Sequence, residues 1–145
     1  MSDSIRVEIK PGLPEPGVFR SMRKAAGWGE VTENQANAAL SGSQFGVVAR
    51  VGGEVIGFGR VVGDGALNRY IQDLIVAEDW RGRGVGDQIL RILTGKIERR
   101  AAPGAMIGLF AAEGREDFYE SRGFRRRPGS GYGAAMMKVV EEARV

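Results

Sequence analysis

The sequence contains no cysteine and no histidine. Their absence excludes disulfide bonds, a cysteine nucleophile with an acyl-cysteine intermediate, Ser-His-Asp catalysis and zinc sites built from cysteine or histidine. Long hydrophobic runs are absent too, since no stretch approaches the ~20 apolar residues that a membrane-spanning helix needs. The first four residues, Met-Ser-Asp-Ser, lack the basic and apolar regions of a signal peptide, so we expect a cytoplasmic protein.

Length and charge set further limits. A chain of 145 residues predicts a single domain over residues 1–145, with one hydrophobic core. The net charge is +3, and arginines supply much of the excess, as in the run 125–127. A basic cluster can attract nucleic acid, but no aromatic residues alternate with the arginines as a single-strand stacking platform requires. We therefore favour a solvated basic face beside a polyanionic ligand.

The most informative segment is a basic, glycine-rich turn between an apolar run, residues 71–76, and an amphipathic helix expected over residues 85–100. Glycines at the start of a helix let an anion approach backbone N–H groups that have no intrahelical partner, and the helix dipole and arginines add attraction. We interpret this turn as a pyrophosphate cradle, formed by Arg81, Gly82, Arg83, Gly84, Val85 and Gly86. A basic turn that binds nothing is the alternative.

The spacing of the glycines selects among phosphate ligands. The dinucleotide pattern G-x-G-x-x-G fails because Asp87 stands where its last glycine belongs, and no glycine of the turn is followed by the Lys and Ser/Thr of a P-loop. The pattern Q/R-x-x-G-x-G/A is filled by Arg81, Gly84 and Gly86. In this the sequence resembles the GNAT superfamily of N-acetyltransferases, whose loop of that pattern binds the pyrophosphate of acetyl-coenzyme A.

A second signature lies downstream. Residues 116–124 predict a short helix that ends at Gly123, followed by a strand from Phe124. The superfamily shows a similar F-Y-x-x-x-G-F pattern after its fifth strand, and Phe118, Tyr119, Gly123 and Phe124 fill it here in the expected order. The resemblance covers residues 46–140, and the segment before them matches only in the order of its elements.

The pattern of the whole chain predicts alternating elements. Strands are expected at 5–9, 45–51, 54–62, 69–76, 106–111, 124–127 and 134–140, and helices at 18–26, 32–40, 85–100 and 115–122. Thr32 and Gln35 have the spacing of a capping box, and the glycines at 52 and 53 join two strands as a hairpin. The predicted fold class is α/β (α+β), with a mixed, mostly antiparallel central sheet flanked by helices. Strands 71–76 and 106–111 would form its parallel pair.

The resemblance implies that the cofactor binds along this parallel pair. In the superfamily the two strands splay apart, and the pantetheine arm lies between them. By motif position, the backbone groups of Leu74 and Val76 would bind it, with Ile75 contributing if a bulge shifts the register. The three adjacent apolar residues at 74–76 fit such a bulge, and they equally fit a strand that is buried on both faces.

Proton transfer requires further residues. The resemblance places Tyr119 beside the coenzyme A sulfur as general acid, with Phe118 next to it at the cofactor, whereas the structural alternative for Tyr119 is core packing. The base is left open among Asp73, Glu120, Tyr70 and a water chain. Asp73 is our candidate, although a carboxylate there could instead bind the amine or support the sheet.

These observations predict an N-acetyltransferase that moves an acetyl group from acetyl-coenzyme A directly to a primary amine, without a metal. A non-catalytic sensor of acyl-coenzyme A is the second hypothesis, and a nucleic-acid-binding module is the third. The acceptor is expected to be a small-molecule or protein amine, with no nucleic acid or membrane partner and with a homodimer left open. Two departures from the superfamily pattern stand out. Ala112 replaces a common asparagine, and residues 77–80 lack a common proline.

Overall fold

The computed structural model of the chain describes residues 6–141 and divides into two compact units, one ending at Leu109 and the other beginning at Phe110. The first unit contains the sheet and three helices of nine residues or more, and the second contains one short helix. The predicted single domain over residues 1–145 stays a prediction.

The first unit is built on a five-stranded sheet whose order in space follows the chain, β1-β2-β3-β4-β5. The strands are β1 (Glu8–Pro11), β2 (Phe45–Val51), β3 (Glu54–Gly63), β4 (Asn68–Val76) and β5 (Met106–Gly108). Neighbouring strands are antiparallel except β4 and β5, which are parallel. The predicted fold class, a mixed and mostly antiparallel sheet with one parallel pair, is therefore confirmed.

The central hairpin forms as expected. Gly52 and Gly53 join β2 to β3 with φ angles of 56° and 84°, the left-handed conformation that the tightest hairpin turns require and that glycine adopts without strain. The first strand differs from its prediction, because pairing with β2 begins at Glu8 and extends to Pro11. Ile5, where that strand was expected to start, lies outside the described residues.

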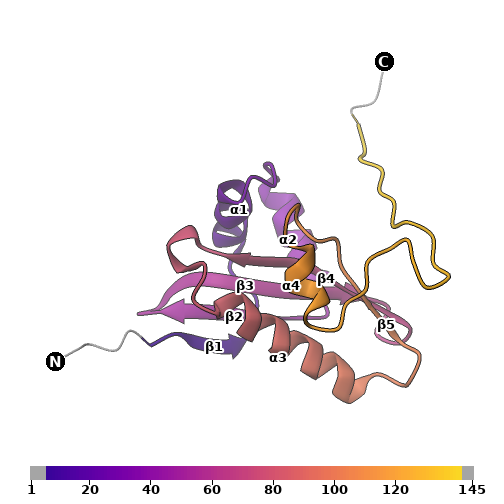
Figure 1. The fold of residues 1–145 in the computed structure, drawn as a ribbon. Coiled ribbons are helices and arrows are strands. Elements are labelled where there is room, and N and C mark those ends of the chain that lie inside the picture. The colour runs from indigo at the N-terminus through magenta and orange to yellow at the C-terminus, as the bar shows by residue number, and fades with distance from the viewer. Residues whose placement is uncertain (1–5, 142–145) are drawn as a thin grey trace. The chain divides into compact units, whose positions relative to one another are not determined.

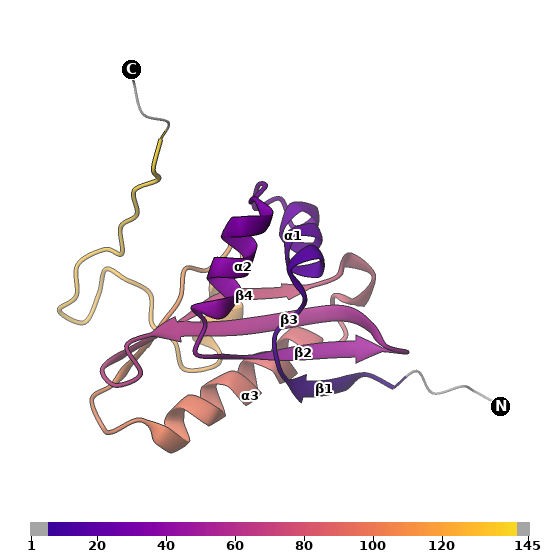
Figure 2. The same cartoon turned by 180° about the vertical axis from the view of Figure 1, so that it is seen from behind.

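Helices cover both faces of the sheet. The helices α1 (Pro16–Ala25) and α2 (Glu33–Ser41) lie on one face, and α3 (Val85–Arg100) lies on the other, as the two opposite views show (Figures 1 and 2). The predicted capping box at α2 is present, since Thr32 and Gln35 bond each other's backbone N–H at 3.0 and 2.8 Å. Helix α1 begins two residues earlier than expected because Pro16, which suits the first turn of a helix, starts it.

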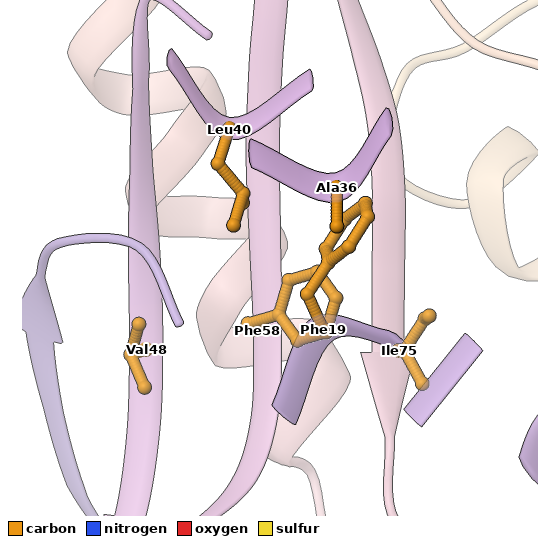
Figure 3. Packing of buried hydrophobic residues seen from close by; sticks show 6 residues of the cluster. All are labelled: Phe19, Ala36, Leu40, Val48, Phe58 and Ile75. Atoms are coloured by element: carbon orange, nitrogen blue, oxygen red, sulfur yellow. The ribbon is translucent and has the colours of Figure 1, made fainter. Parts of the chain in front are cut away.

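The core between α1, α2 and the sheet is a compact apolar cluster (Figure 3). Phe19 and Phe58 are 2% and 0% exposed, with ring centroids 5.7 Å apart. On the opposite face, Gly57 and Gly59 let α3 approach β3 closely. A Cβ atom at Gly59 would lie 2.7 Å from Leu93 Cδ1, so a larger residue there would force side chains of α3 to shift. The sheet therefore fixes the position of α3.

The second unit holds α4 (Glu116–Glu120), shorter than the predicted helix 115–122. The predicted strands 124–127 and 134–140 are wrong, because this segment makes only an isolated bridge between Gly129 and Tyr132. A strand needs partners for its backbone groups, and residues 134–140 are exposed without a ladder. In the first unit, the strand expected over 106–111 likewise ends at Gly108. No helix within residues 6–141 has the length and apolar character to cross a membrane.

Candidate functional site

The glycine-rich turn leads from β4 into α3 through a single 3-10 turn, η1 (Glu78–Trp80). Gly82 and Gly84 adopt φ angles of 74° and 82°, the left-handed conformation that glycine accepts without strain. A Cβ atom built at either position would meet no atom within 4 Å, so the space in front of both is open. At Gly86 the same atom would lie 3.6 Å from a methyl group of Val76, which directs this position toward the sheet.

The start of α3 offers unpaired backbone donors. Its first intrahelical bond from the turn runs from the N–H of Gln88 to the carbonyl of Gly84 at 3.1 Å. From Gly82 to Gly86, no backbone N–H donates to a carbonyl of the described chain. Val85, the first residue of the helix, is only 3% exposed and fixes this end of α3 against the sheet. Unpaired N–H groups in and just before the first turn of a helix are suited to an anion, and the assignment of this turn as a pyrophosphate cradle stays a prediction.

The two arginines of the cradle are positioned differently. The Nε of Arg81 donates to the carbonyl oxygen of Val76 at 3.0 Å, so this side chain connects the turn to the end of β4. The guanidinium of Arg83 lies 4.8 Å from the centroid of the Trp80 ring, within cation–π distance. The guanidinium of Arg81 is thus held at the end of β4, and that of Arg83 is held over the Trp80 ring.

Beside the cradle, β4 presents an open edge. The N–H of Ala77 donates to Ile56 in β3 at 2.8 Å. Because successive residues of a strand direct their backbone groups to opposite sides, the groups of Ile75 face β3 while those of Leu74 and Val76 face away from it. The structure thus places two of the three candidate backbone positions, Leu74 and Val76, on the open side.

That edge is open because the parallel ladder is short. Strand β5 pairs only with residues 68–70 of β4, leaving residues 71–76 without a strand partner on this side within the described chain. Strand β4 contains a bulge at Gln72. Arg60 pairs with Asp73 and Val61 pairs with Ile71, so Gln72 is the extra residue without a partner in β3. The bulge left open by the sequence is therefore present, although it does not direct the backbone of Ile75 to the open edge.

Asp73 lies in a buried ionic cluster. The side chain is 0% exposed; Oδ1 accepts from Nη1 of Arg23 in α1 at 2.5 Å, and Oδ2 accepts from Nε of Arg60 in β3. The bulge makes this possible, because it sets Asp73 on the face of α1 and α2 while Ile71 faces α3. Both oxygens are thus occupied by guanidinium groups, so the geometry argues for a supporting role over that of a proton acceptor.

In the second unit, Tyr119 is half-buried in α4. Its ring packs edge-on against Phe118 and Phe124, with centroid distances of 5.0 and 5.8 Å. Burial raises the pKa of the Tyr119 hydroxyl above its usual value of 10.0, while the nearby charge of Arg115 opposes this shift. The hydroxyl consequently keeps its proton at neutral pH, as a proton donor must.

Phe118 lies between two cations, with the guanidinium carbons of Arg115 and Arg122 at 5.2 and 3.9 Å from its ring centroid. Glu120, a second candidate base, is paired with Arg126. Tyr70, in the first unit, is 40% exposed beside β5, where its ring lies over Gly108. The catalytic assignments of all these residues stay predictions.

Sequence reasoning missed Arg23 and Arg60. A signal for Arg60 was available, because it interrupts the apolar run of β3 at a position that the hairpin pattern would bury. No sequence signal was available for Arg23, since a basic residue on an amphipathic helix is ordinarily solvated. As for metals, no group of three His, Cys, Asp or Glu side chains gathers within residues 6–141.

Comparisons with known proteins identify the family and the fold. A family model described as an acetyltransferase (GNAT) domain matches residues 19–143. No curated protein matches the sequence. Among solved structures, a probable acetyltransferase from meticillin-resistant Staphylococcus aureus is 23% identical with a TM-score of 0.82, covering 92% of this chain and all of that one.

Two further structures are similar. A GNAT-family acetyltransferase from Streptococcus pneumoniae is 25% identical with a TM-score of 0.77, covering 94% of this chain and 100% of that one. A putative acetyltransferase from Deinococcus radiodurans is 25% identical with a TM-score of 0.68, covering 91% of this chain and 87% of that one.

Proposed function

Because this chain belongs to the GNAT family of acetyltransferases, we propose that it transfers an acetyl group from acetyl-coenzyme A to a primary amine by direct attack. The observation that carries the proposal is the adjacency of two features in the first unit. The cradle, with five unpaired backbone N–H groups, continues directly from the open edge of β4. The cradle suits a pyrophosphate, and the open edge of β4 suits the amide groups of an extended pantetheine arm.

The residues of the cradle fit a pyrophosphate. The space before Gly82 and Gly84 is free of protein atoms, and the N–H groups of residues 82–86 would donate to phosphate oxygens. Arg81 and Arg83 would add charge-assisted contacts at the rim. Acetyl-coenzyme A, when bound, supplies the activated thioester, and the protein's part is to hold and orient it.

The open edge of β4 supports the second half of the proposal. The backbone groups of Leu74 would pair with an extended ligand arm as they would with another strand. The N–H of Val76 is available in the same direction, while the carbonyl of Val76 already accepts from Arg81. A backbone N–H at this edge would also stabilise negative charge on the thioester oxygen as the amine attacks.

The reaction needs two proton movements. The amine nitrogen forms a bond to the acetyl carbon while the carbon–sulfur bond breaks, one proton leaves the nitrogen, and one reaches the departing thiolate. We assign the second proton to the Tyr119 hydroxyl, whose raised pKa keeps it protonated at neutral pH. We assign the first to water or Tyr70, because Asp73 holds Arg23 and Arg60.

A thermal shift and an amine panel test the proposal together. Saturating acetyl-coenzyme A, at about 100 times its dissociation constant, should stabilise the folded protein by about 2.7 kcal/mol. NAD and ATP should stabilise it much less. An amine panel then reports free thiol release. Stabilisation without turnover would indicate a sensor, and no stabilisation at millimolar acetyl-coenzyme A would exclude the proposed function.

Metal independence belongs to the same proposal. Turnover should survive treatment with a chelator, and no acetylated enzyme should accumulate without amine, because the acetyl group passes directly between the two substrates. Recovery of chelator-inhibited activity by a divalent ion would contradict this mechanism.

A further inference from the structure

The ionic cluster of Arg23, Arg60 and Asp73 has two positive charges and one negative charge. The side chains are 20%, 9% and 0% exposed, respectively. A buried charge without a counter-ion is costly, since neither water nor an opposite charge offsets its lost hydration. Arg60 and Asp73 alone would form a neutral pair, so the surplus positive charge requires an explanation.

Arg60 is fully engaged by the fold. Its Nε donates to Asp73, and its Nη1 donates to the carbonyl of Ala39 at 3.3 Å and to the hydroxyl of Ser43 at 3.2 Å, both at the end of α2. Its guanidinium carbon also lies 5.5 Å from the centroid of the Phe19 ring. These contacts give Arg60 a structural role that connects β3 to α2.

Arg23 is only partly engaged. Its Nη1 donates to Asp73, whereas its Nε is buried and makes no hydrogen bond within the described chain. Its guanidinium carbon lies 5.5 Å from the Phe19 ring and 5.6 Å from the Trp28 ring, so aromatic surfaces rather than polar groups surround it. As the most exposed member of the cluster, Arg23 presents the surplus charge toward solvent.

Among the described residues, no ion pair other than that with Asp73 neutralises Arg23. Glu30, in the connection between α1 and α2, pairs with Lys24 at 2.8 Å. Arg20, one turn earlier in α1, is another cation and donates to the carbonyl of Val31. On β4, the exposed residue beside Asp73 on the same face is Tyr70, since their β3 partners, Val62 and Arg60, are two residues apart. The guanidinium of Arg23 therefore adjoins the rings of Phe19 and Trp28, and Glu30 and Arg20 are engaged with other partners.

The cluster also adjoins the strand edge of the proposed function. Asp73 directly precedes Leu74, whose backbone groups face the open side of β4. An anion that paired with Arg23 would thus lie within a residue or two of the strand segment on which the thioester is proposed to lie, and one residue of strand spans about 3.3 Å.

We infer that the acceptor amine carries a carboxylate, which Arg23 binds. This inference rests on the proposed function and names its substrate class: a small molecule in which an amino group and a carboxylate lie close together. A carboxylate supplies the single negative charge that neutralises the cluster, and guanidinium groups bind it through paired, charge-assisted hydrogen bonds. The aromatic side chains of Trp28 and Tyr70 would flank the rest of the acceptor.

Matched acceptors test this inference. Each of a set of α- and β-amino acids is compared with its own primary carboxamide, which has nearly the same shape and no negative charge. With the unmodified protein and saturating acetyl-coenzyme A, the acids should show kcat/KM values about 10- to 100-fold higher than the amides, mainly through KM. Equal values, or faster reaction of the amides, would overturn the inference.

Variants then locate the contact. Arg23→Gln should reduce the acid-to-amide ratio toward one, and it leaves Arg60 and Asp73 as a neutral pair, so the fold should tolerate it. Arg23→Lys should recover part of the ratio because it restores the charge. Lys24→Gln is the matched control: it removes one cation from the next position of α1 and should leave the ratio unchanged. An Arg23→Gln variant that kept the wild-type ratio would overturn the inference.

A binding measurement separates this inference from the proposed function. Trp28 lies beside Arg23, so non-aromatic amino acids should change tryptophan fluorescence saturably, and their amides should not. Trp28→Phe should abolish this signal. Saturable binding of the acids without turnover would sustain the anion contact and contradict the proposed function. Equal turnover of the acids and their amides would sustain the proposed function and contradict the anion contact.

Discussion

The cradle and the ionic cluster are both suited to an anion, but they are made from different parts of the chain. The cradle uses backbone N–H groups from consecutive residues at the start of α3, and two of its glycines have open space before them. The cluster uses the side chains of Arg23, Arg60 and Asp73, which come from three elements. A site made of contiguous backbone survives many side-chain changes, whereas a buried cluster of charges depends on the one carboxylate that its cations share.

The largest effect is expected at the centre of the cluster. Asp73→Asn removes the only negative charge between two guanidinium groups and should lower the free energy of unfolding by about 3–5 kcal/mol. Chemical denaturation measures this loss. Asp79→Asn, at an exposed position of η1, is the control and should change stability little. A fully stable Asp73→Asn protein would show that the cluster is not structural.

Substitution in the cradle should weaken binding of the cofactor beyond its effect on stability. Gly84→Ala places a methyl group in the open space and strains a left-handed backbone, which costs about 1–2 kcal/mol of stability. The control is Gly104→Ala, because Gly104 has a similar φ of 94° and equally open surroundings away from the turn. Both variants should lose similar stability, but only Gly84→Ala should lose most of the thermal shift with acetyl-coenzyme A.

Tyr119→Phe tests the proposed proton donor in the second unit. The variant keeps the ring that packs against Phe118 and Phe124 and loses only the proton donor. Turnover should fall by roughly 100-fold with little change in acetyl-coenzyme A affinity, measured with an amine for which chemistry limits the rate.

The pH profile of the same variant sharpens the test. A general acid works while protonated, so wild-type turnover should decline as pH rises through the raised pKa of Tyr119, above 10.0. Tyr119→Phe should lack this alkaline decline. Equal turnover and equal profiles in the two proteins would leave Tyr119 with a packing role alone.

The smallest effect is expected at the rim of the cradle. Arg81→Ala removes a partly solvated cation and the hydrogen bond to the carbonyl of Val76. Water and the remaining N–H groups can compensate, so affinity for acetyl-coenzyme A should fall about fivefold or less, measured by calorimetry. Arg100→Ala, at the other end of α3, should leave affinity unchanged. A larger loss of affinity than that of Gly84→Ala would mean that arginine charge contributes more to binding than the backbone N–H groups do.

The same comparison explains what the sequence could predict. The cradle, the capping box at Thr32 and the hairpin turn at Gly52 depend on residues close together in the chain, and local conformational preference decides them. The cluster depends on residues 23, 60 and 73, which meet only when α1 packs on the sheet and a bulge turns Asp73 toward it. No local sequence pattern predicts that these three residues come together.

The end of the chain shows the opposite failure. Two strands were expected over 124–127, beginning at Phe124, and over the mostly apolar residues 134–140, yet no ladder forms there within the described residues. Strand preference describes a residue's tolerance of extended backbone, whereas a strand exists only with a partner for its hydrogen bonds. Met136 and Val140, 86% and 95% exposed, find no such partner within the described part of the chain.

The sequential order of the sheet has a consequence for how the first unit folds. Strands β2, β3 and β4 are joined by connections of a few residues, so each new pairing closes only a short loop at low entropic cost. The parallel pairing of β4 with β5 must instead wait for residues 77–105, which include the cradle and all of α3. Low contact order favours rapid formation of the antiparallel strands. We therefore expect competence to bind a ligand to be acquired after the antiparallel strands β2, β3 and β4 have paired, when the crossover closes.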